Sequence, residues 1–166
     1  DKCLPAKVFH RYCPELDNNG LTKAGTPVRV QLLGQVADVL AENAVRAIEL
    51  GSHGIDLNFG CPAKTVNKSR GGAVLLKDPD HMYDIIKAVR DAVDSKHQVS
   101  AKIRLGFDDD SNSQEIVDAV VSAGADSIAI HQNLANYIYL NGLEAVNLKK
   151  NFEFTTLANS EILLIL

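Results

Sequence analysis

Residues 54–64 read Gly-Ile-Asp-Leu-Asn-Phe-Gly-Cys-Pro-Ala-Lys, a short apolar strand that ends abruptly at a cysteine. Gly60 permits an unusual backbone conformation before Cys61, and Pro62 removes a ladder hydrogen bond after it. The chain is therefore expected to leave a sheet here and to present the Cys61 thiol to a ligand. Such a thiol can donate a proton or attack a substrate, although a free cysteine is more often a small, inert, buried residue.

Segments typical of strands and helices alternate on both sides of this stretch. Strands are predicted at residues 28–33, 55–58, 98–105 and 127–131, and apolar residues recur at helical spacing over 36–48, 79–93 and 113–121. Asp78 and Pro79 are residue types that start a helix, and Ser113 is predicted to cap the next one. This alternation predicts parallel strands joined by right-handed crossovers, and hence an α/β fold.

The pattern weakens beyond His131. Residues 144–150 are predicted to form a short helix and residues 152–157 a fifth strand. No internal repeat, linker or low-complexity tract divides the chain, so one domain is predicted for residues 1–166.

The composition is that of an ordinary globular domain. Of the 166 residues, 46% are apolar, and neither a run of about 18 apolar residues nor a secretory leader is present, so membrane insertion and export are not predicted. Cys3, Cys13 and Cys61 stand at wide, irregular spacing that fits neither a disulfide framework nor a zinc site. We therefore expect a cytoplasmic protein without a structural metal.

The charge pattern is mildly acidic overall, with one basic cluster. A formal net charge of −4 counts against a protein whose whole surface grips nucleic acid. Lys64, Lys68 and Arg70 nevertheless follow Cys61 with no acidic residue among them. These cations can bind phosphate or can belong to a solvated loop, and the second is the commoner role of short charge clusters.

Polar residues stand at or near the ends of the predicted strands. They are Gln31, Asn58, Lys102 with Arg104, His131 and, after the fifth strand, Asn159. The carboxyl ends of parallel strands meet at one edge, which is where active sites form in a (β/α)8 barrel. A dinucleotide-binding sheet also collects ligands there, but its Gly-x-Gly-x-x-Gly sequence is missing from this chain.

Each of these residues also has a purely structural interpretation. Gln31 could pair with a neighbouring strand, Lys102 could protect a sheet edge, and His131 could be a satisfied core or rim histidine. Their common position at one edge nevertheless favours a polar ligand pocket over a set of unrelated structural roles.

Several motifs resemble those of the tRNA dihydrouridine synthases. They are Lys-Val-Phe-His-Arg at 7–11, Val-Gln-Leu-Leu-Gly at 30–34, Asp-Leu-Asn-Phe-Gly-Cys-Pro-Ala-Lys at 56–64, Gly-Gly-Ala at 71–73 and Lys-Ile-Arg-Leu-Gly at 102–106. The similarity extends from about residue 5 to His131. Within the family it is closest to the members that act on the D-loop uridine at the position conventionally numbered 16.

The resemblance implies a fold and an activity. Members of this family are FMN-containing (β/α)8 barrels followed by a small helical domain, and they reduce the C5–C6 double bond of a tRNA uridine with NADPH or NADH as electron donor. By matching motif, Cys61 would be the catalytic acid, and Asn58 and Arg104 would contact the RNA at the target uridine. A thiol is protonated at neutral pH, which suits a proton donor.

The remaining roles also follow from the resemblance. The residues that would contact FMN are Gln31, Lys102, His131 and the phosphate-side segment Asn159, Ser160 and Glu161. Lys102 would stabilise negative charge on the flavin. Lys64, Lys68 and Arg70 would attract the RNA backbone around a uridine turned out into the pocket.

The chain also departs from the family pattern. A (β/α)8 barrel needs about 250 residues, so we expect a partial barrel of about strands 3 to 7 without the helical domain. After His131 the family continues Gly-Arg-Thr, whereas this chain has Gln132-Asn133-Leu134, and Ser160 replaces a glycine.

Two alternatives therefore stay open. One is another FMN barrel that acts on a free pyrimidine, as dihydroorotate dehydrogenases do. The other is a barrel remnant that binds RNA without catalysis. We expect the protein to be a monomer.

Overall fold

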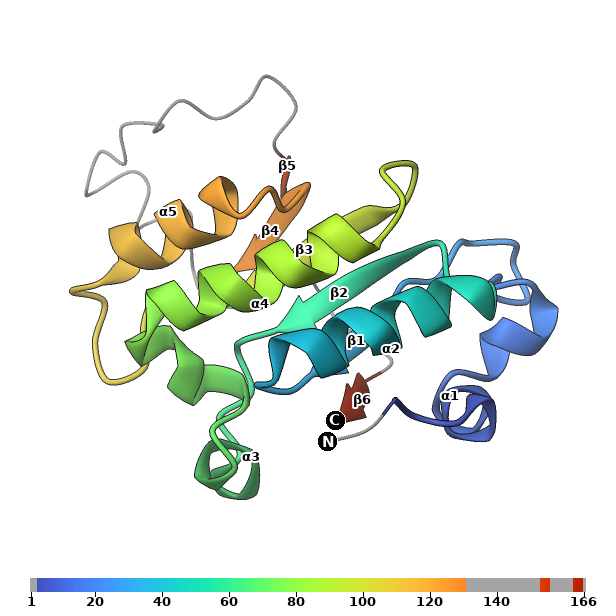
Figure 1. Ribbon diagram of the computed structural model, residues 1–166, viewed down its shortest axis with the longest axis horizontal. Helices are drawn as coiled ribbons and strands as arrows, with labels where there is room; N and C mark the ends of the chain where they lie inside the picture. Colours follow the sequence, from blue (N-terminus) through green and yellow to red (C-terminus); the bar gives the residue numbers. More distant parts are fainter. Residues whose placement is uncertain (1–2, 131–152, 156–162, 166) are drawn as a thin grey trace.

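The computed structural model describes residues 3–130, 153–155 and 163–165. Its centre is a parallel sheet of six strands in the order β5-β4-β3-β2-β1-β6 (Figure 1). The strands are β1 (Val30–Leu33), β2 (Gly54–Asn58), β3 (Gln98–Ile103), β4 (Ser127–Ile130), β5 (Glu153–Thr155) and β6 (Leu163–Ile165). The predicted α/β fold with parallel strands is confirmed.

Three helices lie side by side on one face of the sheet (Figure 1). They are α2 (Ala37–Glu49), α4 (Pro79–Ala92) and α5 (Ser113–Ser122), and α4 contacts both of the others. The shorter helical elements are α1 (Ala6–Tyr12), η1 (Pro14–Asn18), α3 (Lys64–Lys68) and η2 (Gly72–Lys77). No helix in the described part of the chain has both the length and the apolar character that crossing a bilayer requires.

The alternation of side chains along the strands gives the sheet one apolar and one polar face. The apolar residues of β1 to β4 join the buried residues of the three helices in a single core; they include Val30, Leu32, Ile55, Leu57, Val99, Ala101, Ile103, Ile128 and Ile130. The residues between them point to the opposite face, because successive side chains of a strand alternate. This opposite face carries the polar side chains of the strands.

The predicted helix starts are partly correct. Asp78 caps α4, since its carboxylate accepts a hydrogen bond from the His81 backbone N–H at 3.1 Å, and Pro79 is the first helical residue. The prediction that Ser113 caps α5 is wrong, because Asn112 occupies the cap position and Ser113 is already helical. The Asn112 side chain donates instead to the Leu76 carbonyl at 2.7 Å, which ties α5 to η2.

Two strands are shorter than predicted. β1 begins at Val30, because the backbone of Val28 is bonded to Gly20 and His53 and lies outside the sheet. Gln31 is therefore the second residue of its strand and not a residue of the strand end. β3 ends at Ile103, and Arg104 follows the strand instead of belonging to it.

The chain makes a tight turn shortly after β3. At Gly106 a Cβ atom would lie 1.6 Å from the Asp109 carbonyl oxygen, so only glycine fits there.

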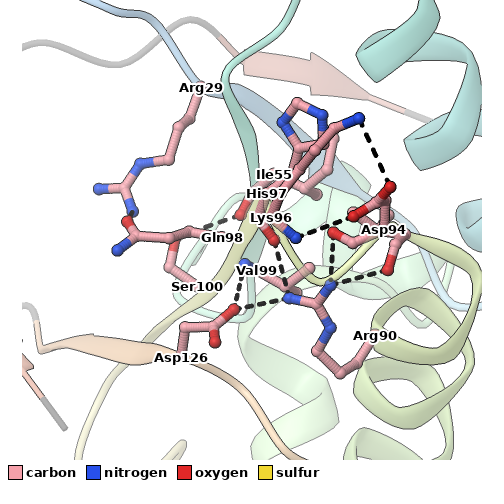
Figure 2. Close-up of polar contacts among 11 residues, drawn as sticks. Arg29, Ile55, Arg90, Asp94, Lys96, His97, Gln98, Val99, Ser100 and Asp126 are labelled. Carbon is pink, nitrogen blue, oxygen red and sulfur yellow. Dashed lines mark hydrogen bonds and ion pairs between the residues drawn. The ribbon is translucent and has the colours of Figure 1, made fainter. Parts of the chain in front are cut away.

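The amino-terminal edge of the sheet is fixed by Arg90, near the end of α4 (Figure 2). Its guanidinium donates to the Val93, Asp94 and His97 carbonyls at 2.7, 3.0 and 2.9 Å, and to the Asp126 carboxylate at 2.6 Å. The same Asp126 oxygen accepts the Val99 backbone N–H at 2.8 Å. One side chain thus connects α4, the loop before β3 and the residue before β4.

Several predictions concern residues outside the described part. They are the helix at 144–150 and the site residues His131, Asn159, Ser160 and Glu161. The predicted fifth strand at 152–157 contains β5, and no strand was predicted for β6.

Candidate active site

The polar face of the sheet is arranged in levels by the strand register. Gln31 of β1 lies opposite Asp56 of β2, and Asp56 lies opposite Ser100 of β3. One level nearer the carboxyl edge, Asn58 of β2 lies opposite Lys102 of β3. Residues opposite each other in a parallel sheet point to the same side, so the predicted site residues Gln31, Asn58 and Lys102 share one face.

A chain of hydrogen bonds joins three of these strands and continues into the loop after β2. Ser100 Oγ donates to Asp56 Oδ1 at 2.6 Å, and Gln31 Nε2 donates to Asp56 Oδ2 at 2.5 Å. Asn58 Nδ2 donates to Gln31 Oε1 at 2.7 Å, and the Gly60 backbone N–H donates to Asn58 Oδ1 at 2.9 Å. We call this series from Ser100 to Gly60 the Asp56 chain. All four of its side chains are less than one-tenth exposed.

The loop that carries Cys61 is held on both sides of its first residues. The Gly60 carbonyl accepts a hydrogen bond from Arg104 Nε at 2.8 Å, and the Phe59 backbone N–H donates to the Lys102 carbonyl at 2.8 Å. Asn58 therefore binds the N–H of Gly60, and Arg104 binds its carbonyl. Both residues were predicted to contact RNA; the structure shows that both bind the residue before Cys61.

Gly72 supports the Cys61 loop from the other side. The Cys61 carbonyl accepts the Ala73 backbone N–H at 2.9 Å. Gly72 has φ +66°, and a Cβ there would lie 2.8 Å from the Cys61 carbonyl oxygen and 3.1 Å from the Cys61 Cβ. Glycine is thus required both for the left-handed backbone and for the close approach of the two segments. This explains why the Gly-Gly-Ala motif accompanies the cysteine motif.

The chain places its cysteines in different environments, and all three thiols are free. Cys13 is fully buried, and its burial, reinforced by the charge of Glu15, raises the pKa of its thiol to about 11. Cys3 is exposed, and Cys61 is partly exposed on its loop. Cys61 is therefore accessible to a substrate in a way that Cys13 is not.

Two residues of the basic cluster lie on a short helix, and the third follows it. Lys64 and Lys68 are the first and last residues of α3, and Arg70 follows in the left-handed conformation with φ 59°. All three side chains are exposed, and none of them forms an ion pair within the described residues. They are available to a phosphate backbone.

Asp56 and Ser100 were not predicted from the sequence. Asp56 stands two residues before Asn58 in a strand whose other side chains are apolar, so both point to the same face. That spacing was a usable signal for Asp56. Ser100 had no comparable signal, because its role depends on the pairing of β3 with β2.

The donors and acceptors on this face fit the polar edge of a flavin. An amide side chain has two N–H donors and an oxygen with two lone pairs, and the Asp56 chain uses one of each at Gln31. The second N–H donor and the second oxygen lone pair of the Gln31 amide match a ring edge that has both a carbonyl and an N–H. The ammonium group of Lys102 is carried on the same face. Among the described residues, no group of three His, Cys, Asp or Glu side chains could hold a metal ion.

Comparison with known sequences identifies the family of this chain. The sequence model described as dihydrouridine synthase matches residues 2–163. The chain is 52% identical over 166 residues to the tRNA-dihydrouridine(16) synthase of Haemophilus influenzae, which covers 98% of this chain and 54% of that protein. It is 49% identical over 166 residues to the tRNA-dihydrouridine(16) synthase of Escherichia coli K12, which covers 98% and 53%.

A third relative shows higher identity over a shorter segment. It is the tRNA-dihydrouridine(16) synthase of Shewanella oneidensis, 60% identical over 131 residues, covering 79% of this chain and 42% of that protein. The chain spans about half the length of the curated relatives it matches. Since the family match extends over nearly all of its residues, the chain belongs to the dihydrouridine synthase family.

Proposed function

We propose that this chain forms the catalytic face of a tRNA dihydrouridine synthase that reduces the C5–C6 double bond of a D-loop uridine. The observation that carries the proposal is the loop of Cys61, gripped through Gly60 by Asn58 and Arg104 at the carboxyl edge of a parallel sheet. The names of the relatives support position 16 as the target. A partial (β/α)8 barrel is the architecture that best accounts for the parallel sheet covered by helices.

The roles proposed for the side chains come from the family resemblance and, for Gln31 and Lys102, are supported by their common place on the polar face. When bound, FMN would supply the hydride for C6 of the uracil, with NADPH or NADH as the source of electrons. Gln31 would hydrogen-bond the flavin ring, and Lys102 would stabilise its negative charge. His131 and the segment Asn159, Ser160 and Glu161 complete the proposed FMN contacts.

The proton for C5 comes from this chain. Cys61 is partly exposed and follows a glycine whose backbone is fixed on both sides, so its thiol is proposed as the general acid. Asn58 and Arg104 would contact the uridine with the capacity that remains to them, since the bond to Gly60 uses one of the five N–H donors of arginine.

The surface beside Cys61 is suited to RNA. Lys64, Lys68 and Arg70 are exposed and unpaired with acidic residues of the described chain, so they would attract the phosphate backbone of the tRNA. A protein with these features is proposed to work in the cytoplasm as a monomer without a metal.

Two measurements test the proposal. Oxidised flavin bands that travel with the purified protein on gel filtration after addition of FMN would support an assembled cofactor site. Dihydrouridine in tRNA treated with the flavin-loaded protein and NADPH would then support the activity. If a free pyrimidine is reduced in preference to tRNA, the protein is a different flavin oxidoreductase, and if neither is reduced the catalytic proposal fails.

A further inference from the structure

The Asp56 chain contains two side-chain amides, and an amide can be placed in either of two orientations. In the observed direction, Gln31 turns its NH2 group to Asp56 and its oxygen to Asn58. Asn58 then turns its own oxygen to the Gly60 backbone N–H. If both amides were reversed, the NH2 group of Asn58 would face the N–H of Gly60, and this last hydrogen bond would be lost.

One residue of the Asp56 chain allows the hydrogen bonds of this series to run in only one direction. An ionised carboxylate accepts hydrogen bonds and cannot donate them. Asp56 already accepts from Ser100 Oγ and Gln31 Nε2, and it is only 8% exposed, so water has little access to replace these partners. Because Asp56 Oδ2 accepts from the NH2 group of Gln31, the Gln31 oxygen faces Asn58, and that choice determines the orientation of Asn58.

We propose that Asp56 is a positioning residue for the reaction: its buried carboxylate orients the amides of Gln31 and Asn58 and thereby holds the loop that carries Cys61. Asp56 acts through Gln31, Asn58 and Gly60, and it touches neither the uridine nor Cys61 in this role. The importance of the loop for catalysis rests on the proposed function, whereas the coupling from Asp56 to the loop does not.

The three cysteines of the protein provide a direct test of the positioning role of Asp56. Iodoacetamide labelling of the purified protein, followed by mass spectrometry of the peptides, gives a separate rate for each thiol. Cys61 reports on the loop, exposed Cys3 serves as the reference, and buried Cys13 reacts only when the protein unfolds. The measured quantity is the ratio of the Cys61 rate to the Cys3 rate, with neither flavin nor tRNA present.

Two variants of Asp56 are expected to raise this ratio. Asp56→Asn removes the charge and permits both amide directions, so roughly a twofold to threefold increase is expected. Asp56→Ala removes the acceptor altogether, and roughly a fivefold increase is expected, the factor that corresponds to one net hydrogen bond. Hydrogen exchange of the Gly60 backbone N–H should rise in the same order, which provides a readout that does not depend on thiol ionisation.

A matched control is available at the other edge of the sheet. Asp126 is also an aspartate that accepts two hydrogen bonds, in its case one from the Arg90 side chain and one from the Val99 backbone (Figure 2). Asp126→Asn should lower the temperature of unfolding but leave the Cys61 to Cys3 ratio unchanged. A ratio that rises equally in this variant would show that general loosening, and not the Asp56 chain, exposes Cys61.

The outcomes separate the two proposals. A wild-type ratio in both Asp56 variants, with Cys13 still protected, overturns the positioning role. If Asp56→Ala labels Cys13 and has therefore unfolded, Asp56→Asn decides, and a wild-type ratio in it overturns the role. An increased ratio in a protein that never reduces tRNA would support the positioning role and reject the proposed function.

Discussion

The two ends of the sheet each contain a buried or partly buried polar network, and the two networks are built differently. At the amino-terminal edge, Arg90 donates to three carbonyls and to Asp126, so its charge is neutralised and its donors are used inside the protein. At the carboxyl edge, the Asp56 chain ends on Gly60, next to a partly exposed thiol. The first network closes on itself, and the second ends at a loop that can meet a substrate.

This difference assigns separate tasks to the two edges. Substitutions in the Arg90 network should change the free energy of unfolding, because its partners are backbone groups that hold α4 to β3 and β4. Substitutions in the Asp56 chain should change catalysis or cofactor binding more than the free energy of unfolding. Active sites of α/β folds gather at the carboxyl ends of the strands, which agrees with this division.

Removing the thiol should have the largest effect. In Cys61→Ala, the fixed proton donor is lost while Gly60 keeps both of its contacts, so uridine reduction should fall by about 10²- to 10⁴-fold. Flavin content and the temperature of unfolding should stay near those of the wild type. Quantification of dihydrouridine in tRNA checks this, and an undiminished yield would remove Cys61 from the catalytic role.

Removing the guanidinium of Arg90 should have the largest effect on the free energy of unfolding. Arg90→Ala leaves the Asp126 carboxylate and three carbonyls without their donor, which should lower the free energy of unfolding by about 3 kcal/mol. Arg90→Lys should recover part of this loss, because lysine keeps the charge but lacks the planar fork. Urea unfolding gives both values. If folded Arg90→Ala protein lost flavin binding, the two edges of the sheet would be coupled and would not have separate roles.

Gly72 tests whether close packing at the carboxyl edge matters beyond its backbone conformation. Gly72→Ala combines a left-handed φ with a Cβ 2.8 Å from the Cys61 carbonyl oxygen, whereas Gly25→Ala has a similar φ of +80° and no atom within 4 Å. Both variants bear the conformational cost, so the difference between them isolates the clash. We expect Gly72→Ala to be less stable than Gly25→Ala by about 2 kcal/mol. Equal losses in urea unfolding would mean that the Cys61 loop moves freely away.

Lys102 lies one level nearer the carboxyl edge than Ser100 on the polar face. Its substitution should have a moderate effect on FMN affinity. Loss of the ammonium group in Lys102→Ala should weaken FMN binding by about 5- to 10-fold. Fluorescence titration with FMN measures the change, and the control is Lys87→Ala, which removes a partly exposed lysine of α4 that pairs with Asp91 on the same helix. Normal flavin affinity in Lys102→Ala would count against its cofactor role.

Much of the fold was predictable from local patterns. The alternation of β2, α4, β3 and β4 and the cap at Asp78 follow from apolar periodicity and from the chemistry of helix ends, both of which are local. The glycine and proline around Cys61 likewise indicated a loop after a strand. These features need no knowledge of distant partners.

The residues that were missed depend on contacts between distant segments. Gln31 was predicted near a strand end because the bonds of Val28 to Gly20 and His53, which delay the start of β1, have no local signal. Asp56 pairs with a residue 25 positions away, and Arg90 with one 36 positions away. Register across the sheet decides the first pairing, and the packing of α4 against the residue before β4 decides the second; a local sequence pattern gives neither.

The smallest expected effect concerns pH at the amino-terminal edge. A hydrogen bond from the Lys96 backbone N–H, helped by the charge of Lys96, lowers the pKa of Asp94 in the loop that Arg90 binds (Figure 2). A lowered folded-state pKa stabilises the protein above the unfolded pKa of about 3.9, and this contribution disappears as the pH falls through the folded value. Asp94→Asn should therefore be slightly less stable than the wild type at pH 6, and the gap should close below pH ~4. Urea unfolding of the two proteins across this range measures the gap. A gap of constant size would assign the stabilisation to the shape of the turn, because the charge that titrates would then contribute nothing.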